Sequence, residues 1–287
     1  MNCSIGQCEL FNRPINYPIT KLPDYQMRPL TLCVLLTAAA VVALPGCQAA
    51  LGGLNARASD EWTRTYPLAA NGELQVVNSN GRLEVEGVEG NMAEVRAERI
   101  ARAATEAAAR ELLPRIEINE DVRPDRVAIE TRRPSGILIG VSFEVQYRVR
   151  VPKTALVRLR TVNGELVVTA LGGRLVAATT NGAVTGRDLT GGVDARATNG
   201  RVTIDVGSLG AEPIDLRTVN GVLQLTLPQA ARANVSASCT NGVIDVSGAS
   251  LELMGEQSRR RVRGRMNGGG TPVELTTTNG SIRVAVR

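Results

Sequence analysis

The sequence predicts an all-β protein: a β-solenoid-like stack of short strands with Asn-Gly turns, flanked by a β-rich segment with one short helix. Two observations carry this prediction. Asn-Gly dipeptides recur along the chain, and apolar residues follow them at fixed offsets of three and five positions. Period-two alternation that starts at a fixed distance from a turn indicates strands with one buried face. With 287 residues, 43% of them hydrophobic, the chain is long enough to bury one or two cores.

The N-terminal part reads as an export signal. Residues 30–44 form an apolar run that is short for a membrane-spanning helix, which needs ~20 residues, but that fits the apolar region of a secretory signal. Met27 and Arg28 supply the short positive start that such a signal needs. We therefore expect a signal peptide at 27–46 and interpret residues 1–26 as an extension from a wrongly assigned start.

The signal ends in the motif LPGC at residues 44–47, which resembles a bacterial lipobox, although Pro45 departs from the usual small or β-branched residue. The resemblance implies lipidation of Cys47 and a membrane anchor through an N-terminal lipid. Gln48 in place of aspartate then implies the outer membrane, facing the periplasm or the cell surface. An ordinary cleaved signal and an uncleaved anchor are the alternatives. Residues 47–59 read as a flexible tether.

Residues 60–152 read as an N-terminal β segment with one short helix. Thr105–Leu113 is the one good helical stretch, rich in Ala, Glu, Arg and Leu, and Pro114 stops it. Alternating runs on both sides of it predict strands at 93–103, 116–120, 126–131 and 142–152. We expect this segment to cap or flank the stack, because the last repeat unit of a stack (a rung) would otherwise leave an open sheet edge.

Residues 153–287 hold the regular Asn-Gly repeat. Its structural turns, with one earlier copy, are predicted at Asn80-Gly81, Asn163-Gly164, Asn181-Gly182, Asn199-Gly200, Asn220-Gly221, Asn241-Gly242 and Asn279-Gly280. In the last six copies the residue directly before the asparagine is β-branched and the one before that is small. Second turn signals such as Thr190-Gly191-Gly192 fall midway, so each unit of 18–21 residues holds two short strands and two turns.

Two arrangements suit this repeat. Asn-Gly is the strongest two-residue hairpin signal, which favours an antiparallel meander. A solenoid explains better why equivalent residues recur at near-constant spacing along the sequence. In a solenoid the equivalent residues of successive repeat units lie above one another, ~4.8 Å apart. The solenoid predicts a ladder of hydrogen bonds between the side chains of stacked asparagines. It also predicts a positive φ at each turn glycine.

The composition argues against catalysis. The chain has no histidine, which excludes Ser-His and Cys-His catalysis and zinc sites that need imidazole. Cys239 fills a slot that neighbouring copies fill with Thr or Ala, which indicates a packing residue. Single aspartates such as Asp205 and Asp215 favour a solvated face over calcium binding or a sugar-cleaving carboxylate pair. We predict no catalytic residue, no metal and no cofactor.

The one concentrated charge is an arginine cluster in the longest gap between Asn-Gly turns of the repeat. It comprises Arg259, Arg260, Arg261, Arg263 and Arg265. This cluster fits anion binding, with lipid headgroups, an anionic surface polymer or an envelope protein as partners. The alternative is an Arg-rich outer strand with Val262 pointing inward. Nucleic acid is not expected as a partner, because charges alternate elsewhere and aromatic residues make up only 2% of the chain.

The repeated pattern T-x-N-G-x-φ-x-φ, in which φ is apolar, resembles the bacterial putative-adhesin family of β-strand repeat proteins. Val151-Pro152 before the repeats and the closing run 264–286 add to the likeness, which covers roughly residues 62–287. The resemblance implies an exported or membrane-associated protein, and the family has no agreed catalytic residues to carry over to this chain. We expect a non-enzymatic envelope or surface lipoprotein that acts as an adhesin. A regulatory partner of another membrane protein is the alternative, and a polysaccharide-active β-helix enzyme is less favoured.

Overall fold

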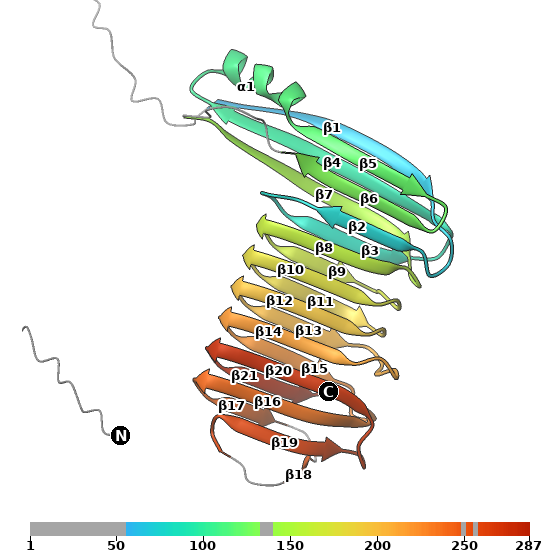
Figure 1. The fold of residues 1–287 in the computed structure, drawn as a ribbon, viewed down its shortest axis with the longest axis vertical. Coiled ribbons are helices and arrows are strands. Elements are labelled where there is room, and N and C mark those ends of the chain that lie inside the picture. Colours follow the sequence, from blue (N-terminus) through green and yellow to red (C-terminus); the bar gives the residue numbers. More distant parts are fainter. Residues whose placement is uncertain (1–55, 133–139, 248–250, 255–257) are drawn as a thin grey trace, which may run out of the picture. The chain divides into compact units, whose positions relative to one another are not determined.

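A computed structural model describes residues 56–132, 140–247, 251–254 and 258–287 of the chain. The expected signal peptide and Cys47 lie outside the described residues. Within the described ranges, two β-sheets face each other across one apolar core, accompanied by a single α-helix (Figure 1). No helix in this part of the chain is long and apolar enough to cross a membrane. The predicted all-β, solenoid-like fold is confirmed.

Within the described ranges, the sheets contain ten and eleven strands. Sheet A runs in spatial order through β1 (Ala56–Pro67), β4 (Met92–Ala103), β7 (Ser142–Pro152), β3 (Leu83–Val88), β9 (Leu166–Thr169), β11 (Val184–Leu189), β13 (Val202–Val206), β15 (Leu223–Leu227), β21 (Ile282–Val286) and β17 (Ile244–Ser247). Sheet B runs through β18 (Leu251–Leu253), β19 (Arg261–Met266), β16 (Ala233–Asn241), β20 (Thr271–Asn279), β14 (Ile214–Asn220), β12 (Val193–Asn199), β10 (Leu175–Asn181), β8 (Leu156–Asn163), β2 (Glu73–Val77), β6 (Arg126–Arg132) and β5 (Glu117–Arg123).

Each regular rung consists of one strand of sheet B, an Asn-Gly turn and one strand of sheet A. β8 leads into β9, β10 into β11, β12 into β13 and β14 into β15, and equivalent strands of successive rungs pair in parallel. The register superposes equivalent residues, so Asn181 lies between Asn163 and Asn199. The strands that flank an Asn-Gly turn belong to different sheets and form no hairpin. The repeat is therefore a parallel solenoid and not an antiparallel meander.

The core between the sheets is filled by the apolar columns that follow the turns. In the first column Leu166, Val184, Val202, Leu223 and Ile282 are each 0% exposed. Burying such a side chain stabilises the fold by about 1.5–3 kcal/mol relative to leaving it exposed. Because the columns repeat in every rung, the core runs through the whole stack without a break.

Gly186 interrupts the second apolar column, and the structure shows what takes its place. The register of β11 shifts between Gly186 and Leu189, and Asp188 in this bulge adopts a φ of 52°. The bulge turns Leu189 into the core, where it is 1% exposed. A Cβ on Gly186 would collide with the side chains of Leu189 and Ile204. The glycine therefore leaves room for a leucine three positions later.

The order of the rungs in space differs from their order in the sequence at both ends. At the N-terminal end the rung β2/β3 lies between β6/β7 and β8/β9. At the C-terminal end the last rung of the chain, β20/β21, lies between β14/β15 and β16/β17 (Figure 1). Antiparallel strands then close the stack, with β1, β4 and β5 at one end and β19 and β18 at the other.

The expected helix of the N-terminal segment is confirmed as α1 (Glu106–Leu112). Thr105 caps it by accepting a hydrogen bond from the Ala108 N–H at 3.2 Å, and a 3-10 turn, Leu113–Arg115, follows. β1 begins at Ala56, so residues 56–59, which we expected in the tether, belong to a strand. The reason is that β1 pairs with β4 over its whole length.

Candidate functional site

Seven asparagines of the stacked turns form a continuous ladder of side-chain hydrogen bonds. In spatial order the asparagine ladder runs through Asn80, Asn163, Asn181, Asn199, Asn220, Asn279 and Asn241. From the second member onward, each Nδ2 donates to the Oδ1 of the preceding asparagine at 2.8 or 2.9 Å. The backbone continues the sheet pattern through the turn, since the Gly182 N–H donates to the Asn199 carbonyl at 3.0 Å. The turns thereby hold successive rungs in register.

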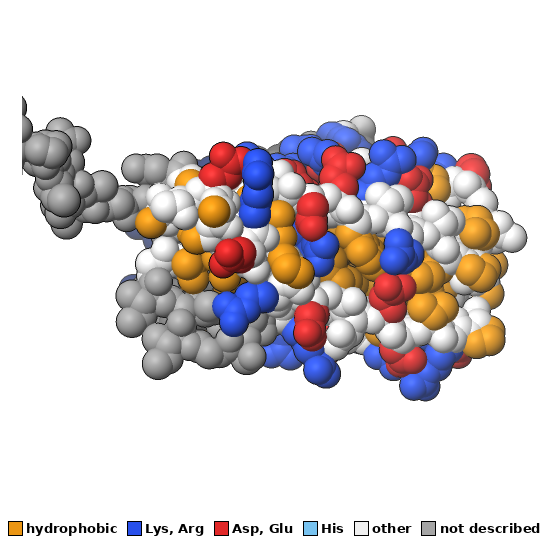
Figure 2. Space-filling view, turned by 90° about the horizontal axis from the view of Figure 1, so that it is seen from above, with side chains coloured by type: hydrophobic (Ala, Val, Ile, Leu, Met, Phe, Trp, Pro, Cys, Tyr) orange, Lys and Arg blue, Asp and Glu red, His pale blue; other side chains and the backbone are white. Residues whose placement is uncertain are grey.

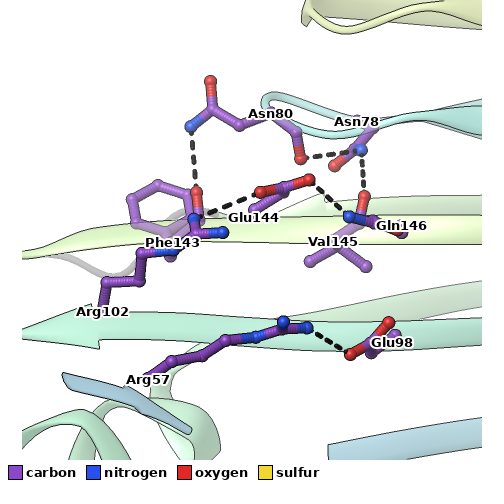
Figure 3. A network of polar contacts seen from close by, with 9 residues as sticks. All are labelled: Arg57, Asn78, Asn80, Glu98, Arg102, Phe143, Glu144, Val145 and Gln146. Carbon is purple, nitrogen blue, oxygen red and sulfur yellow. Dashed lines mark hydrogen bonds and ion pairs between the residues drawn. The ribbon is translucent and has the colours of Figure 1, made fainter. Parts of the chain in front are cut away.

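At its N-terminal end the asparagine ladder ties into β7, which has no Asn-Gly turn of its own. Asn80 donates to the Phe143 carbonyl at 3.3 Å, and Asn78 donates to the Val145 carbonyl at 2.7 Å (Figure 3). Asn78 is buried and also donates to the Asn80 carbonyl at 3.0 Å. Backbone carbonyls of β7 therefore replace the missing asparagine.

The turn glycines are needed for close packing between rungs. Positive φ values, which we expected at all of them, occur at Gly81, Gly182, Gly242 and Gly280. The expectation is wrong for the other three, Gly164, Gly200 and Gly221. A Cβ on Gly200 would lie far inside van der Waals distance of the Gly182 carbonyl oxygen, and the same collision recurs along the stack. A side chain at this position would force neighbouring rungs apart.

The slot two residues before each asparagine faces the core beside the turn. Thr218 is buried there and donates to the Gly200 carbonyl of the adjacent rung at 3.0 Å, and Thr179 makes the equivalent bond at 3.1 Å. Ala197 fills the same slot without a hydroxyl. Cys239 occupies it as a buried free thiol. What the members share is small size, which the packing of the turn requires.

The arginine cluster lies at the C-terminal end of sheet B. Arg261, Arg263 and Arg265 alternate along β19 with residues that face inward. The other two members, Arg259 and Arg260, precede the strand in an exposed turn. The structure therefore places all five arginines of the cluster, each of them exposed, at one end of the stack.

The surroundings of the arginine cluster offer hydrogen-bonding groups. On the neighbouring strand β16, Ser238, Ser236 and Asn234 lie opposite the three arginines of β19. A hollow of about 540 Å³ opens between β16, β19 and the loop 268–270, with two cluster arginines in its wall. Arg265 donates to the Met254 sulfur at 3.0 Å. The first three arginines of the cluster form no ion pair within the described residues.

On two of the regular rungs, an arginine of sheet B pairs with an aspartate of its own strand. Arg196 pairs with Asp194 at 2.9 Å, and Arg217 pairs with Asp215 at 2.8 Å. The hydrogen bond from Arg217 to Asp215 raises the pKa of the Arg217 guanidinium. The end of the stack seen from above in Figure 2 also shows acidic and basic side chains interspersed, with apolar ones between them.

Asp205 and Asp215, which could have formed the carboxylate pair of a sugar-cleaving enzyme, do not come together. Asp205 lies on the outward face of sheet A, whereas Asp215 lies on the outward face of sheet B, with the core between them. Asp194 and Asp215 are neighbours in register, but each carries its own arginine. Among the described residues, no group of three acidic or cysteine side chains is placed to hold a metal ion.

Strand register also brings together four arginines that are far apart in the sequence. We call the residues of this register line the basic row. In spatial order it contains Arg160, Ala178, Arg196, Arg217, Thr276, Ser238 and Arg261. The row was not predicted from the sequence, because the predicted strands rested on the apolar positions after the turns and not on the polar positions before them. The sequence does contain the pattern that reveals the row, since every member except the last stands three residues before an asparagine of the ladder.

Residues 68–285 match the Toastrack DUF4097 family. The chain belongs to this family. The matched segment runs from the end of β1 into β21, so it covers the whole solenoid of the Toastrack chain. The expected family of β-strand repeat proteins is thereby confirmed, while the lipid anchor lies outside the matched residues. No curated protein matches the chain.

Three solved structures resemble the Toastrack chain at low identity. A putative cell adhesion protein from Clostridium sporogenes is 12% identical, with a TM-score of 0.45 over 79% of this chain and 100% of the other. A putative adhesin from Bacteroides fragilis is 10% identical, with a TM-score of 0.29 over 79% and 97%. A putative lipid binding protein from Parabacteroides distasonis is 11% identical, with a TM-score of 0.26 over 78% and 96%. These likenesses are too distant to transfer a function.

Proposed function

We propose that this Toastrack protein is an exported, lipid-anchored component of the bacterial envelope that binds anionic groups as an adhesin and catalyses no reaction. The observation that carries the proposal is the arginine cluster, with its exposed side chains beside a hollow of about 540 Å³. Guanidinium groups form charge-assisted, often paired hydrogen bonds with carboxylates and phosphates. Anionic headgroups, acidic surface polymers and acidic envelope proteins share this chemistry.

The stack supports such a role because it presents the binding groups on a regular scaffold. The asparagine ladder and the parallel register hold equivalent side chains at a constant spacing along the sheet. Shallow contacts repeated along one scaffold reach a high total affinity without a deep pocket. The separation of Asp205 from Asp215 on opposite faces also favours binding over glycoside cleavage.

Replacing the five arginines of the arginine cluster by glutamine tests the binding role. We expect affinity for vesicles with anionic headgroups, or for soluble polygalacturonate, to fall about ten-fold or more at low salt. The matched control replaces five exposed arginines that pair with acids elsewhere, Arg57, Arg82, Arg96, Arg110 and Arg123. It changes the net charge equally. Retained binding in the cluster variant, or an equal loss in the control, contradicts the proposal.

The lipid anchor rests on the leader sequence and needs a separate test. Replacing Cys47 by serine should abolish incorporation of a labelled fatty acid and release the protein from the membrane fraction. Cys33→Ser, inside the expected signal, is the control and should leave both unchanged. Density fractionation of the native protein then tests the outer-membrane location that Gln48 implies. A native protein without lipid label would disprove the anchor.

A further inference from the structure

The basic row extends the positive charge of the arginine cluster along sheet B. Its four arginines, on β8, β12, β14 and β19, are exposed. The members between them are alanine, threonine and serine, so no carboxylate stands in the row from β8 to β19. At ~4.8 Å per strand, six strand spacings give the row a length of about 29 Å.

A shallow hollow of about 840 Å³ runs beside this row and crosses the strands from β2 to β20. Arg160, Arg196 and Arg217 line it, and Thr180 and Thr198 line it on the side of the asparagine ladder. The aspartates of β12 and β14 stand two positions before the row and are not part of the lining. The described lining of the hollow therefore contributes guanidinium groups and no carboxylate, although Asp194 and Asp215 lie 2.9 and 2.8 Å from two of those guanidinium groups.

We propose that this hollow binds one linear polyanion, a polysaccharide or polyol chain that carries carboxylates or phosphates, laid across the strands and leading to the arginine cluster. The inference rests on the proposed function and extends it from one end of the stack to the outward face of sheet B. Row and hollow both run along the stack, so one extended chain in the hollow contacts Arg160, Arg196 and Arg217. Beyond β20 the same chain reaches Arg261 by following the register line over Ser238. Ala178, the smallest member of the row, lines the hollow between Arg160 and Arg196, where an extended chain fits better than a flat membrane surface.

The arginines of the row retain the capacity to bind such a chain. Arg160 forms no ion pair among the residues that the structure describes. Arg196 and Arg217 have half-exposed side chains, and their ion pairs use only part of the five N–H donors of each guanidinium. Such surface pairs contribute only ~0–1 kcal/mol, so a second anion competes readily. Affinity is then the sum of repeated weak contacts and increases with the length of the polyanion.

Chain length is the first measurement. Oligogalacturonates and polyphosphates of increasing length are titrated into the purified protein, with neutral dextran as the uncharged control. We expect affinity to rise with length until the oligomer spans the basic row, and then to level off. The two probes show whether carboxylates or phosphates are preferred. Affinity that does not depend on length, or equal binding of dextran, would overturn the inference.

Variants then locate the binding track. The combined change Arg160→Gln, Arg196→Gln and Arg217→Gln should lower affinity for the longest oligomers at least ten-fold and barely affect short ones that reach only the arginine cluster. The matched control is Arg148→Gln, Arg187→Gln and Arg283→Gln, which removes three exposed arginines from sheet A. It should bind as the native protein does. Thermal unfolding of both variants checks that the stack is intact.

The outcomes separate this inference from the proposed function. If the five-arginine variant loses binding while the row variant keeps it for all lengths, the proposed function stands and the polyanion track is wrong. If neither variant loses affinity, both are wrong. If the row variant loses affinity for anionic vesicles as strongly as for long oligomers, the face binds a membrane and the linear polyanion is the wrong ligand.

Discussion

Asn199 occupies the middle of the asparagine ladder, donating to Asn181 at 2.9 Å and accepting from Asn220 at 2.8 Å. Asn199→Ala removes both bonds. At ~0.5–1.5 kcal/mol per bond, we expect the free energy of unfolding to fall by about 1–3 kcal/mol, measured by urea denaturation. Thr198→Ala, next to it on the exposed face, is the control and should change stability by less than about 0.5 kcal/mol. Equal effects of the two changes would show that the ladder does not stabilise the stack.

Tyr147 couples stability to alkaline pH. Its side chain is 1% exposed and its hydroxyl bonds to Thr131 at 2.7 Å. Burial raises the pKa of Tyr147 to about 12, whereas the unfolded chain has the ordinary value of ~10. The unfolded state therefore loses its proton first, so the stabilisation is complete below about pH 10 and is lost as the pH rises through the folded value.

The predicted size of this loss is roughly 2–3 kcal/mol, from ~1.4 kcal/mol for each pKa unit. It is measured as the free energy of unfolding by urea at a series of alkaline pH values. In Tyr147→Phe the decline should be smaller by that amount. Tyr66 remains in the variant. Burial and the hydrogen bond to Glu120 also raise the pKa of Tyr66, so it accounts for the pH dependence of stability that remains. An unchanged pH profile in the variant would contradict the prediction.

At the scale of the element, the last rung of the chain is an interior one. β21 pairs with β15 on one side and with β17 on the other, whereas β21 is the one partner of β17 among the described strands. Chain termini usually open first. Here we expect amides of β21 to exchange with solvent as slowly as those of β15 and more slowly than those of β17, in hydrogen exchange followed by mass spectrometry. Fastest exchange in residues 282–286 would contradict this placement.

The helix and the strands were predictable where buried and exposed residues alternate regularly along a short stretch of sequence. The offsets from each asparagine placed the strands from β8 to β15, and Thr105 with Pro114 bounded the helix. The insertion of β20/β21 before β16/β17 was not predictable. Every rung has the same pattern of apolar and polar positions, so the pattern describes the inside of a rung and does not say which rung lies next to it.

At the scale of the whole solenoid, a complete rung should be dispensable. Deleting Gly182–Asn199 joins Asn181 to Gly200, which restores an Asn-Gly turn and brings β10 next to β14 with equivalent residues in register. Because each rung contacts only its neighbours, we expect a folded, cooperative protein. Its melting temperature should fall by roughly 2–8 °C, which corresponds to 1–2 kcal/mol for a domain of this size.

The control for this deletion removes half a rung. Without residues 190–199, β11 would lead directly into the turn before β13, and both strands belong to sheet A. The alternation between the sheets is then broken, and we expect this variant to be insoluble or unfolded by circular dichroism. If it folds as well as the full-rung deletion, the rung is not the unit of this structure.

The sequence by itself determined the rung: the positions of its turns, the columns that face the core, the small slot that Cys239 fills and the absence of histidine chemistry. These follow from periodicity within about twenty residues, where burial of one strand face is a local property. Only the tertiary structure decided the parallel pairing, the order of rungs at both ends, the close glycine contacts and the basic row. Each of these depends on which strands become neighbours, and a pattern repeated in every rung fits many neighbours equally well.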